Sequence, residues 1–325
     1  MTPRNRLCNI VLDSCCDLPR EIFDSLGVGL LQFPFTMDDG ERFDDLGLSM
    51  SPHAFYDRLR KGERASTSQI PYSMLLDAFE KAAAEPLPTV FLAFSSGLSS
   101  TFGMMLQILE ETRRKYPESE IYVVDTLLAS VAEGFLVWEA VRQAERGLSA
   151  RELVSWVEEA RWFVNPYFTL PDLETLRCGG RIPDVAALVG GKLDIKPILS
   201  FDLTGHLAFH GAVRGRKKAV KQLVQLYLER SSDDRPGTVL LASADAPKEL
   251  KDIEEQLLRG IPGLAPTIYS MSVGPVIGAH TGPDLLALVF WGRDRRQDLS
   301  LTDRIANAVS GRKASADQTE SRRDV

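Results

Sequence analysis

The chain has 325 residues, of which 44% are hydrophobic and 26% are charged, and its formal net charge at pH 7 is −7. These proportions are typical of a globular protein and exclude a disordered or fibrous chain. The length exceeds what one small domain needs, so we expect two packed domains. The excess of acidic residues argues against non-specific binding to nucleic acid or to anionic membranes.

The first half of the chain alternates short apolar runs with longer amphipathic segments. Residues 7–13 predict a buried strand, and Asp17 and Pro19 predict the N-cap and the first turn of a helix over residues 19–27. This alternation favours a mostly parallel sheet with helices on both faces. The elements predicted next are strands over 89–94 and 121–125 and helices over 101–115 and 129–146.

The second half has a mixed pattern. A helical segment over 150–163 leads into Asn165-Pro166, and we place the domain change there. Beyond it we predict a hairpin of strands 195–201 and 206–213, helices 216–229 and 247–258, and strands 238–242, 267–271 and 285–291. The sequence thus predicts an α/β protein of two α/β domains: residues 1–164 with a mostly parallel sheet flanked by helices, and residues 165–296 with a mixed α/β arrangement. A C-terminal helix or flexible tail is expected over 297–325.

The cysteines and the first residues bear on the cellular compartment. The four cysteines are Cys8, Cys15, Cys16 and Cys178, and none is spaced as CxxC, so neither a zinc site nor a disulfide framework is indicated. The start of the chain lacks the apolar core of a secretory signal, and no apolar run approaches the roughly 18–20 residues of a membrane span. We therefore expect a cytoplasmic protein without integral membrane contact, although a transient visit to a membrane surface stays open.

The sequence motifs of several common enzyme classes are missing. The chain contains no GxxxxGK[ST] loop, no GxGxxG after the first strand, no HExxH and no GxSxG. His206 and His210 are four residues apart but fall in the predicted hairpin, so we expect surface residues there rather than metal ligands. We therefore predict no catalytic residues, no metal and no cofactor.

Loops rich in glycine and hydroxyl residues follow several predicted strands. At the carboxyl ends of parallel strands such loops form the binding crevice of α/β proteins, and their hydroxyl and N–H groups suit a carboxylate or a phosphate. Ser96, Ser99 and Ser100 are, alternatively, N-caps for the helix over 101–115. The loops are DSCCDLP (13–19), STSQ (66–69), SSGLSST (95–101), GGRI (179–182) and GPVIGAHTGP (274–283).

The chain resembles the DegV family of bacterial fatty-acid-binding proteins in these loops, in the run over 172–201 and in the segment VRGRKKA (213–219). The segments occur in the same order as in the family, and the resemblance covers nearly the whole chain to about residue 292. The resemblance implies two α/β domains that enclose a long-chain fatty acid between them, with its carboxylate near the domain junction. It also implies a separate fatty-acid kinase that converts the bound acid to an acyl-phosphate for phospholipid synthesis. The protein would then be a lipid carrier without catalytic activity of its own.

The resemblance also assigns a carboxylate site. It places Thr67, Ser95, Ser96 and His280 around the carboxylate, with Arg181 as charge compensation, which fits the need of a desolvated carboxylate for several donors or a cation. The sequence departs from the family at Cys15-Cys16, at Ser100 and at Asp284. The last adds a negative charge near His280, which is expected to raise the pKa of that histidine or to repel a head group.

A basic cluster without intervening acids contains Arg214, Arg216, Lys217 and Lys218, followed by Lys221. It is either a solvated helix start or a docking surface for an acidic partner, for which the resemblance makes a fatty-acid kinase the natural candidate.

Two other functions stay open at this point. One is a kinase-like or phosphotransfer subunit that acts on a small carbonyl or phosphate substrate, with His280 in a catalytic role. The other is a regulatory module whose lipid occupancy reports membrane-lipid supply to a partner. The apolar residues that flank the loops offer a tunnel lining, or are simply core. They are Phe94, Leu98, Phe102, Met104, Met105, Ile108, Phe163, Phe168, Ile182, Leu188, Val189, Leu193, Ile195, Ile198 and Ile277.

Overall fold

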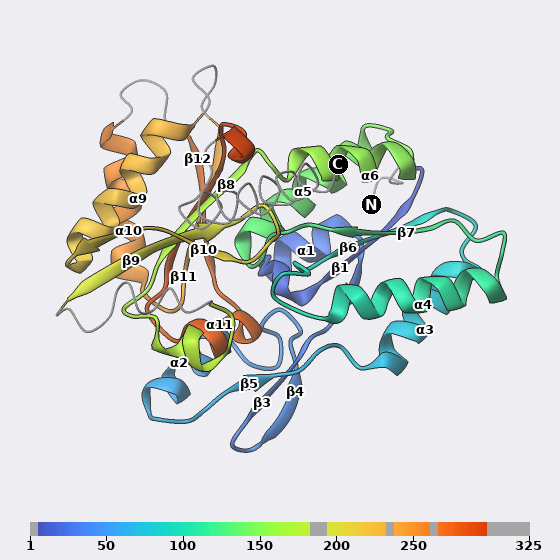
Figure 1. Cartoon of the computed structure of the whole chain (residues 1–325), viewed down its shortest axis with the longest axis horizontal. Helices are drawn as coiled ribbons and strands as arrows, with labels where there is room; N and C mark the ends of the chain where they lie inside the picture. Colours follow the sequence, from blue (N-terminus) through green and yellow to red (C-terminus); the bar gives the residue numbers. More distant parts are fainter. Residues whose placement is uncertain (1–5, 183–193, 232–236, 261–265, 298–325) are drawn as a thin grey trace, which may run out of the picture.

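The computed structural model describes residues 6–182, 194–231, 237–260 and 266–297 (Figure 1). Sheet A has four parallel strands, β2 (Gly29–Leu31), β1 (Asn9–Asp13), β6 (Thr89–Ala93) and β7 (Ile121–Asp125), in that spatial order. Every residue of the central strand β6 is buried, as a parallel strand covered on both faces requires. The predicted parallel first sheet is thus confirmed.

Helices cover both faces of sheet A. Helices α3 (Tyr72–Ala84) and α4 (Thr101–Lys115) pack on one face, whereas α5 (Val131–Glu145) and α6 (Ala150–Ala160) lie on the other (Figure 1). The start of α6 is fixed by a capping box, in which the Ser149 side chain accepts from Glu152 N and Glu152 reaches back to Ser149 N. The short helix α1 (Arg20–Leu26) follows β1.

Sheet C is mixed, as the second half of the sequence predicts. Its strands, in spatial order, are β10 (Leu207–Arg214), β9 (Ile195–Phe201), β8 (Val164–Thr169), β13 (Leu286–Trp291), β11 (Thr238–Ser243) and β12 (Thr267–Ser272). The predicted hairpin is β9–β10. Helices α9 (Arg216–Arg230) and α10 (Pro247–Gly260) cover the outer face of this sheet (Figure 1).

The alternation of side chains along β13 separates two apolar cores. Leu286, Leu288 and Phe290 pack with the residues under α9 and α10. Ala287 and Val289 point the other way, into the larger core that sheet C shares with α5 and sheet A. This larger core runs across both halves of the chain, and the domain boundary at residues 164/165 stays a prediction.

The sequence does not predict several of the helices and strands. They are the small antiparallel sheet B, with β4 (Gly40–Phe43), β3 (Pro34–Met37) and β5 (Ser66–Thr67), and helices α2 (Pro52–Arg60), α7 (Glu174–Cys178) and α11 (Pro275–Thr281). Residues 274–283, expected as a loop, therefore contain a short helix that begins with proline. Of the C-terminal helix or flexible tail expected over 297–325, only Gln297 is described, as the last residue of a 3₁₀ turn (Arg295–Gln297).

The expected N-cap at Asp17 is wrong. Helix α1 begins after Pro19 without a side-chain cap, and Asp17 instead ends a 3₁₀ turn over Ser14–Cys16 in the left-handed conformation. Its buried carboxylate accepts from Ser130 Oγ and from Gly274 N, 2.9 Å away, so it joins three distant segments. A residue used in tertiary contacts of this kind is not available for the adjacent helix.

Candidate functional site

A cavity opens between the carboxyl ends of sheet A and the inner face of sheet C. Its empty volume is about 1020 Å³, including the space at its mouth. Cys15, Phe33, Phe94 and Ala129 reach it from segments that follow β1, β2, β6 and β7, as expected for the crevice at this edge of a parallel sheet. The other apolar lining residues are Leu98, Val131, Ala132, Pro166, Tyr167, Phe168, Leu176, Phe201, Leu207, Val276, Ile277, Leu285, Ala287 and Val289.

Some apolar residues expected to line a tunnel do so. Phe94, Leu98, Phe168 and Ile277 line this cavity. Met105 and Ile108 are instead buried in the core along α4, the structural alternative left open by the sequence. Leu188, Val189 and Leu193 lie outside the described residues.

Polar lining residues from loops far apart in the sequence contact one another at one side of the cavity. Thr67 Oγ1 lies 2.7 Å from His280 Nε2, and Ser100 Oγ donates to Gln69 Oε1 at 2.8 Å. The Arg181 guanidinium donates to the carbonyls of Leu98 and Gly179. The structure therefore brings together Thr67, Arg181 and His280, three of the five predicted carboxylate-binding residues.

His280 is neutral at physiological pH. Burial, together with the nearby positive charge of Arg181, lowers its pKa from an ordinary 6.5 to about 4. Its Nδ1 is buried without a hydrogen-bond partner among the described residues, and a Cβ at Gly179 would lie only 2.6 Å from it. A neutral imidazole carries one N–H. With the proton on Nε2, His280 donates to Thr67 Oγ1 and leaves the Thr67 hydroxyl proton for another acceptor; with the proton on Nδ1, the Thr67 hydroxyl donates to His280 Nε2.

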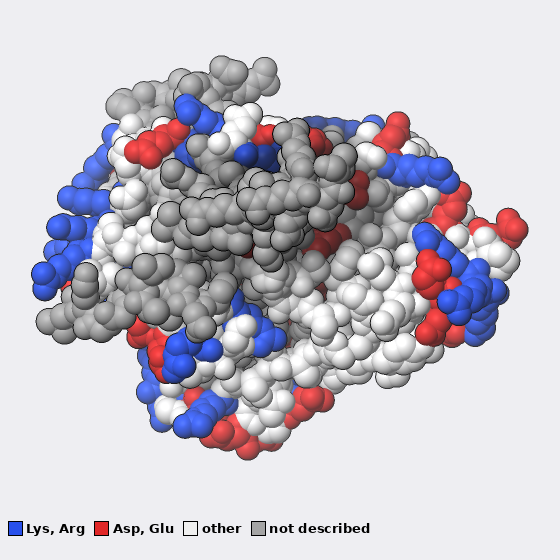
Figure 2. All heavy atoms as spheres, in the orientation of Figure 1, with Lys and Arg blue, Asp and Glu red and all other residues white. Residues whose placement is uncertain are grey.

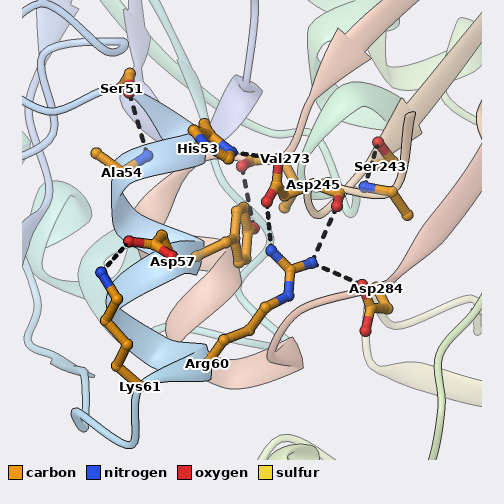
Figure 3. Close-up of polar contacts among 12 residues, drawn as sticks. Ser51, His53, Ala54, Asp57, Arg60, Lys61, Ser243, Asp245, Val273 and Asp284 are labelled. Atoms are coloured by element: carbon orange, nitrogen blue, oxygen red, sulfur yellow. Dashed lines mark hydrogen bonds and ion pairs between the residues drawn. The ribbon is translucent and has the colours of Figure 1, made fainter. Parts of the chain in front are cut away.

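The expected rise in the pKa of His280 does not occur: that pKa is lowered, by burial and by Arg181, and Asp284 is not among the causes. Asp284 Oδ1 instead accepts from Arg60 Nη2 at 2.7 Å (Figure 3). The same guanidinium pairs with Asp245, which also contacts His53 Nδ1 at 2.9 Å. The negative charge of Asp284 is thereby engaged by a cation on α2.

Helix α2 also holds α11, the helix that carries His280. Tyr56 Oη donates to Val273 O at 3.0 Å, just before α11 begins. Within α11, a Cβ at Gly278 would lie 2.5 Å from Tyr56 Oη and 2.8 Å from Phe55 Cε1. The close approach of the two helices therefore depends on glycine at this position.

Ser95 and Ser96 are placed differently from Thr67. Ser95 Oγ is buried and donates to Gly205 O at 2.8 Å, and Ser96 is exposed, with its N–H donating to Asp125 Oδ1. Neither lines the cavity, whereas Ser99 and Ser100 of the same loop do. Ser99 Oγ accepts from Thr101 N, but the N-cap of α4 is Ser100, which makes no side-chain capping bond, so the capping role that the sequence suggested is not confirmed.

Gln69 and Ser100 are two of the polar cavity residues that the predicted carboxylate site does not include. Both belong to loops that the sequence singles out, the STSQ and SSGLSST segments. Only the contact between the two loops shows which members of each face the cavity.

Buried acidic side chains lie next to residues that line the cavity. Asp13 accepts from Cys15 N at 3.0 Å and from Phe94 N at 2.7 Å, so it fixes the loops that follow β1 and β6. Burial raises its pKa to about 7. Glu133 is fully buried, both of its oxygens lack a partner among the described residues, and its pKa is raised well above the ordinary value by burial and by Asp13. Asp13 therefore braces these loops, as the sequence suggested.

The predicted basic cluster is only partly accessible. The Arg216 guanidinium is partly buried, donates to Asp284 O and lies 3.9 Å from Glu249 Oε1. Arg214, Lys217 and Lys218 are exposed. Figure 2 shows Lys and Arg side chains along the left edge of the molecule, where Figure 1 places α9 and α10.

Comparison with known sequences decides the family. The profile of the DegV family of uncharacterised proteins matches residues 8–293. The chain belongs to the DegV family. A DegV domain-containing protein of Clostridium perfringens is 35% identical over 283 residues, which cover 87% of this chain and 97% of that protein. Another, from Lactococcus lactis, is 31% identical over 291 residues and 99% of its length.

Solved DegV structures share the fold. DegV of Bacillus subtilis, described as a fatty-acid-binding protein, is 25% identical, with a TM-score of 0.77 over 89% of this chain and 100% of that one. A fatty-acid-binding DegV protein of Thermus thermophilus has the same TM-score and coverage at 24% identity. In the described part of this DegV chain, no cluster of His, Cys, Asp or Glu is arranged to hold a metal ion. The helices described here also fall short of the length and apolarity needed to cross a bilayer.

Proposed function

We propose that this DegV protein binds a long-chain fatty acid, with the acyl chain in the cavity and the carboxylate at Thr67, His280 and Arg181. The observation that carries the proposal is an apolar cavity whose interacting polar side chains, one of them cationic, lie at one side. The B. subtilis relative, described as a fatty-acid-binding protein, supports it. A direct role for Ser95 and Ser96 stays a prediction.

Burial of the acyl chain contributes enough free energy for the binding that a fatty-acid carrier needs. About fifteen methylene and methyl groups of a palmitate-sized chain, at roughly 0.8 kcal/mol each, give on the order of 12 kcal/mol before costs. Lost freedom of the ligand and ordering of the protein subtract at least about 4 kcal/mol. Tight binding therefore requires that nearly the whole chain is enclosed.

Denaturing extraction and mass spectrometry of the freshly purified protein test this proposal. We expect about one fatty acid per chain. Thr67→Val removes a hydroxyl without changing side-chain shape, and loss of a hydrogen bond to a charged group costs about 1.5–3 kcal/mol, or about 10- to 150-fold in affinity. Thr89→Val is the matched control, because Thr89 is a buried strand threonine outside this cavity. Lipid-free protein that takes up neither oleate nor palmitate would refute the proposal.

We further propose that the protein has no catalytic activity of its own and presents the bound acid to a fatty-acid kinase. The exposed Arg214, Lys217 and Lys218 support a docking surface for an acidic partner, since charge complementarity mainly accelerates encounter. With purified kinase and ATP, Lys217→Glu/Lys218→Glu should slow acyl-phosphate formation without lowering fatty-acid occupancy. Arg113→Glu/Arg114→Glu, on exposed positions of α4, is the control. Equal rates for both double variants would exclude this surface, and calorimetric binding of ATP to the protein alone would favour a kinase-like subunit.

A further inference from the structure

Four chain segments meet in a ring at the polar side of the cavity. The contacts between them are Thr67–His280, Arg181–Leu98 and Ser100–Gln69, at 2.7, 3.3 and 2.8 Å between their polar atoms. A Cβ at Gly179, whose carbonyl accepts from Arg181, would lie 2.6 Å from His280 Nδ1 and thus completes the ring. Gln69 and Ser100 therefore belong to the same ring as the proposed carboxylate site, and both line the cavity.

The hydrogen-bond donors of the proposed carboxylate site are partly used within the protein. The Thr67–His280 pair has two polar hydrogens, and one of them lies between Oγ1 and Nε2, so a single donor remains for a ligand. Arg181 Nε and Nη1 already donate to the carbonyls of Leu98 and Gly179, so the Nε–Nη2 edge of the guanidinium is not free to hold a carboxylate bidentately. The two oxygens of a carboxylate accept about four hydrogen bonds, so a bound acid has acceptor positions that another donor can fill.

Most of the other serine and threonine hydroxyls that line the cavity donate their hydrogen to protein acceptors. These bonds run from Ser99 to Thr101 Oγ1, from Ser100 to Gln69 Oε1, from Ser130 to Asp17 Oδ2 and from Thr281 to Ile277 O. Ser68 lines the cavity, is exposed, and has no hydrogen-bond partner for its hydroxyl among the described residues. The hydroxyl of Ser68 and the amide of Gln69 are therefore the two candidates for a further donor.

Gln69 is the stronger candidate because its side chain is oriented by Ser100. The Ser100 hydroxyl is bonded to Oε1, so Nε2 keeps both of its N–H groups, and the described part of the chain offers them no acceptor. Two N–H groups fixed in this way suit an anion, whereas Oε1 in their place would repel it. Ser100 is also a position at which the sequence departs from the DegV family, so this orientation of Gln69 depends on a residue particular to this chain.

We propose that Gln69 is a further carboxylate-binding residue, positioned by Ser100, and that it favours an ionised acid over a neutral lipid with the same chain. The inference rests on the proposed fatty-acid binding and adds a residue that distinguishes fatty acids from fatty alcohols. Gln69 Nε2 donates to the carboxylate beside the donor from the Thr67–His280 pair, and Ser100 acts only by holding Oε1. Because hydrogen bonds to an ionised acceptor are stronger than those to a neutral one, the amide contributes more to binding of an acid than of an alcohol.

The test measures how palmitate and hexadecanol partition between the full-length protein and phosphatidylcholine vesicles. Gln69→Glu keeps the shape of the side chain and replaces the N–H groups by a carboxylate oxygen. It should lower the affinity for palmitate at least about tenfold and leave the affinity for hexadecanol unchanged or higher. Ser100→Gly removes the bond to Oε1 without removing a ligand contact, so it should lower the affinity for palmitate by only about two- to tenfold.

Gln107→Glu is the matched control. Gln107 is an exposed glutamine of α4 that does not line the cavity, so this variant adds the same charge outside the site. Both affinities should stay at the wild-type values.

Other results overturn the role of Gln69 while leaving fatty-acid binding in place. They are wild-type affinity for palmitate in Gln69→Glu, an equal loss for palmitate and hexadecanol in that variant, or an equal loss in Gln107→Glu. Gln69→Met, which removes the N–H groups without adding charge, separates the two candidate donors: loss of palmitate binding in Ser68→Ala but not in Gln69→Met assigns the donor to Ser68. Failure of the wild type to bind palmitate overturns the proposed function itself.

Discussion

The packing of α2 against α11 makes Gly278→Ala a sharp test of how His280 is positioned. The added methyl carbon would lie 2.5 Å from Tyr56 Oη and 2.8 Å from Phe55 Cε1. Neither neighbour can move easily, because Phe55 and Tyr56 are completely buried and the Tyr56 hydroxyl is bonded to Val273 O. Helix α11 must therefore move away from α2.

Two opposing effects set the change in the free energy of unfolding that Gly278→Ala causes. Overpacking costs about 1–3 kcal/mol, and alanine gains up to about 1 kcal/mol over glycine in helix propensity, so we expect a net loss of up to about 2 kcal/mol in the free energy of unfolding. The shift also displaces His280, two residues further along α11, and should weaken fatty-acid retention.

Urea unfolding and lipid extraction measure the two effects. Gly103→Ala in α4 is the matched control, because nothing lies within 4 Å of a Cβ at that position. It should leave the free energy of unfolding unchanged or raise it by up to about 1 kcal/mol. If Gly278→Ala is as stable as Gly103→Ala and keeps its lipid, the close contact between α2 and α11 does not exist as described.

Three further predictions concern protonation and capping. Burial raises the pKa of Asp44 to about 7, so the folded state holds a proton that the unfolded state releases near pH 4. The free energy of unfolding should therefore fall by up to about 1.4 kcal/mol per unit as pH rises from 4 to 7, and less steeply in Asp44→Asn; equal slopes in urea titrations would contradict this. His280, with its pKa lowered to about 4 by burial and Arg181, should show no NMR titration between pH 6 and 8, and its contribution to stability should be lost as pH falls from 6.5 to 4. Ser149→Ala removes the capping box of α6 and should cost about 1 kcal/mol in urea unfolding, whereas an unchanged midpoint would show that the cap is dispensable.

The sequence by itself determined the elements with strong periodicity. Helix α4 and strands β7 and β9 occur over the predicted residues, because an amphipathic stripe or a continuous apolar run specifies both the element and the face that it buries. The order of the motif loops also indicated the family, and the position of those loops after parallel strands indicated where a cavity would form.

Only the tertiary structure decided which residues of those loops face the cavity. Thr67 and His280 are 213 residues apart and meet because β5 and α11 pack together, whereas Ser95 turns to Gly205. Short elements such as α11 and β5 carry too few residues for a periodic signal, so packing against α2 and β3 fixes them. The contact of Phe135 with Trp291 likewise depends on how α5 crosses sheet C, which no local pattern encodes.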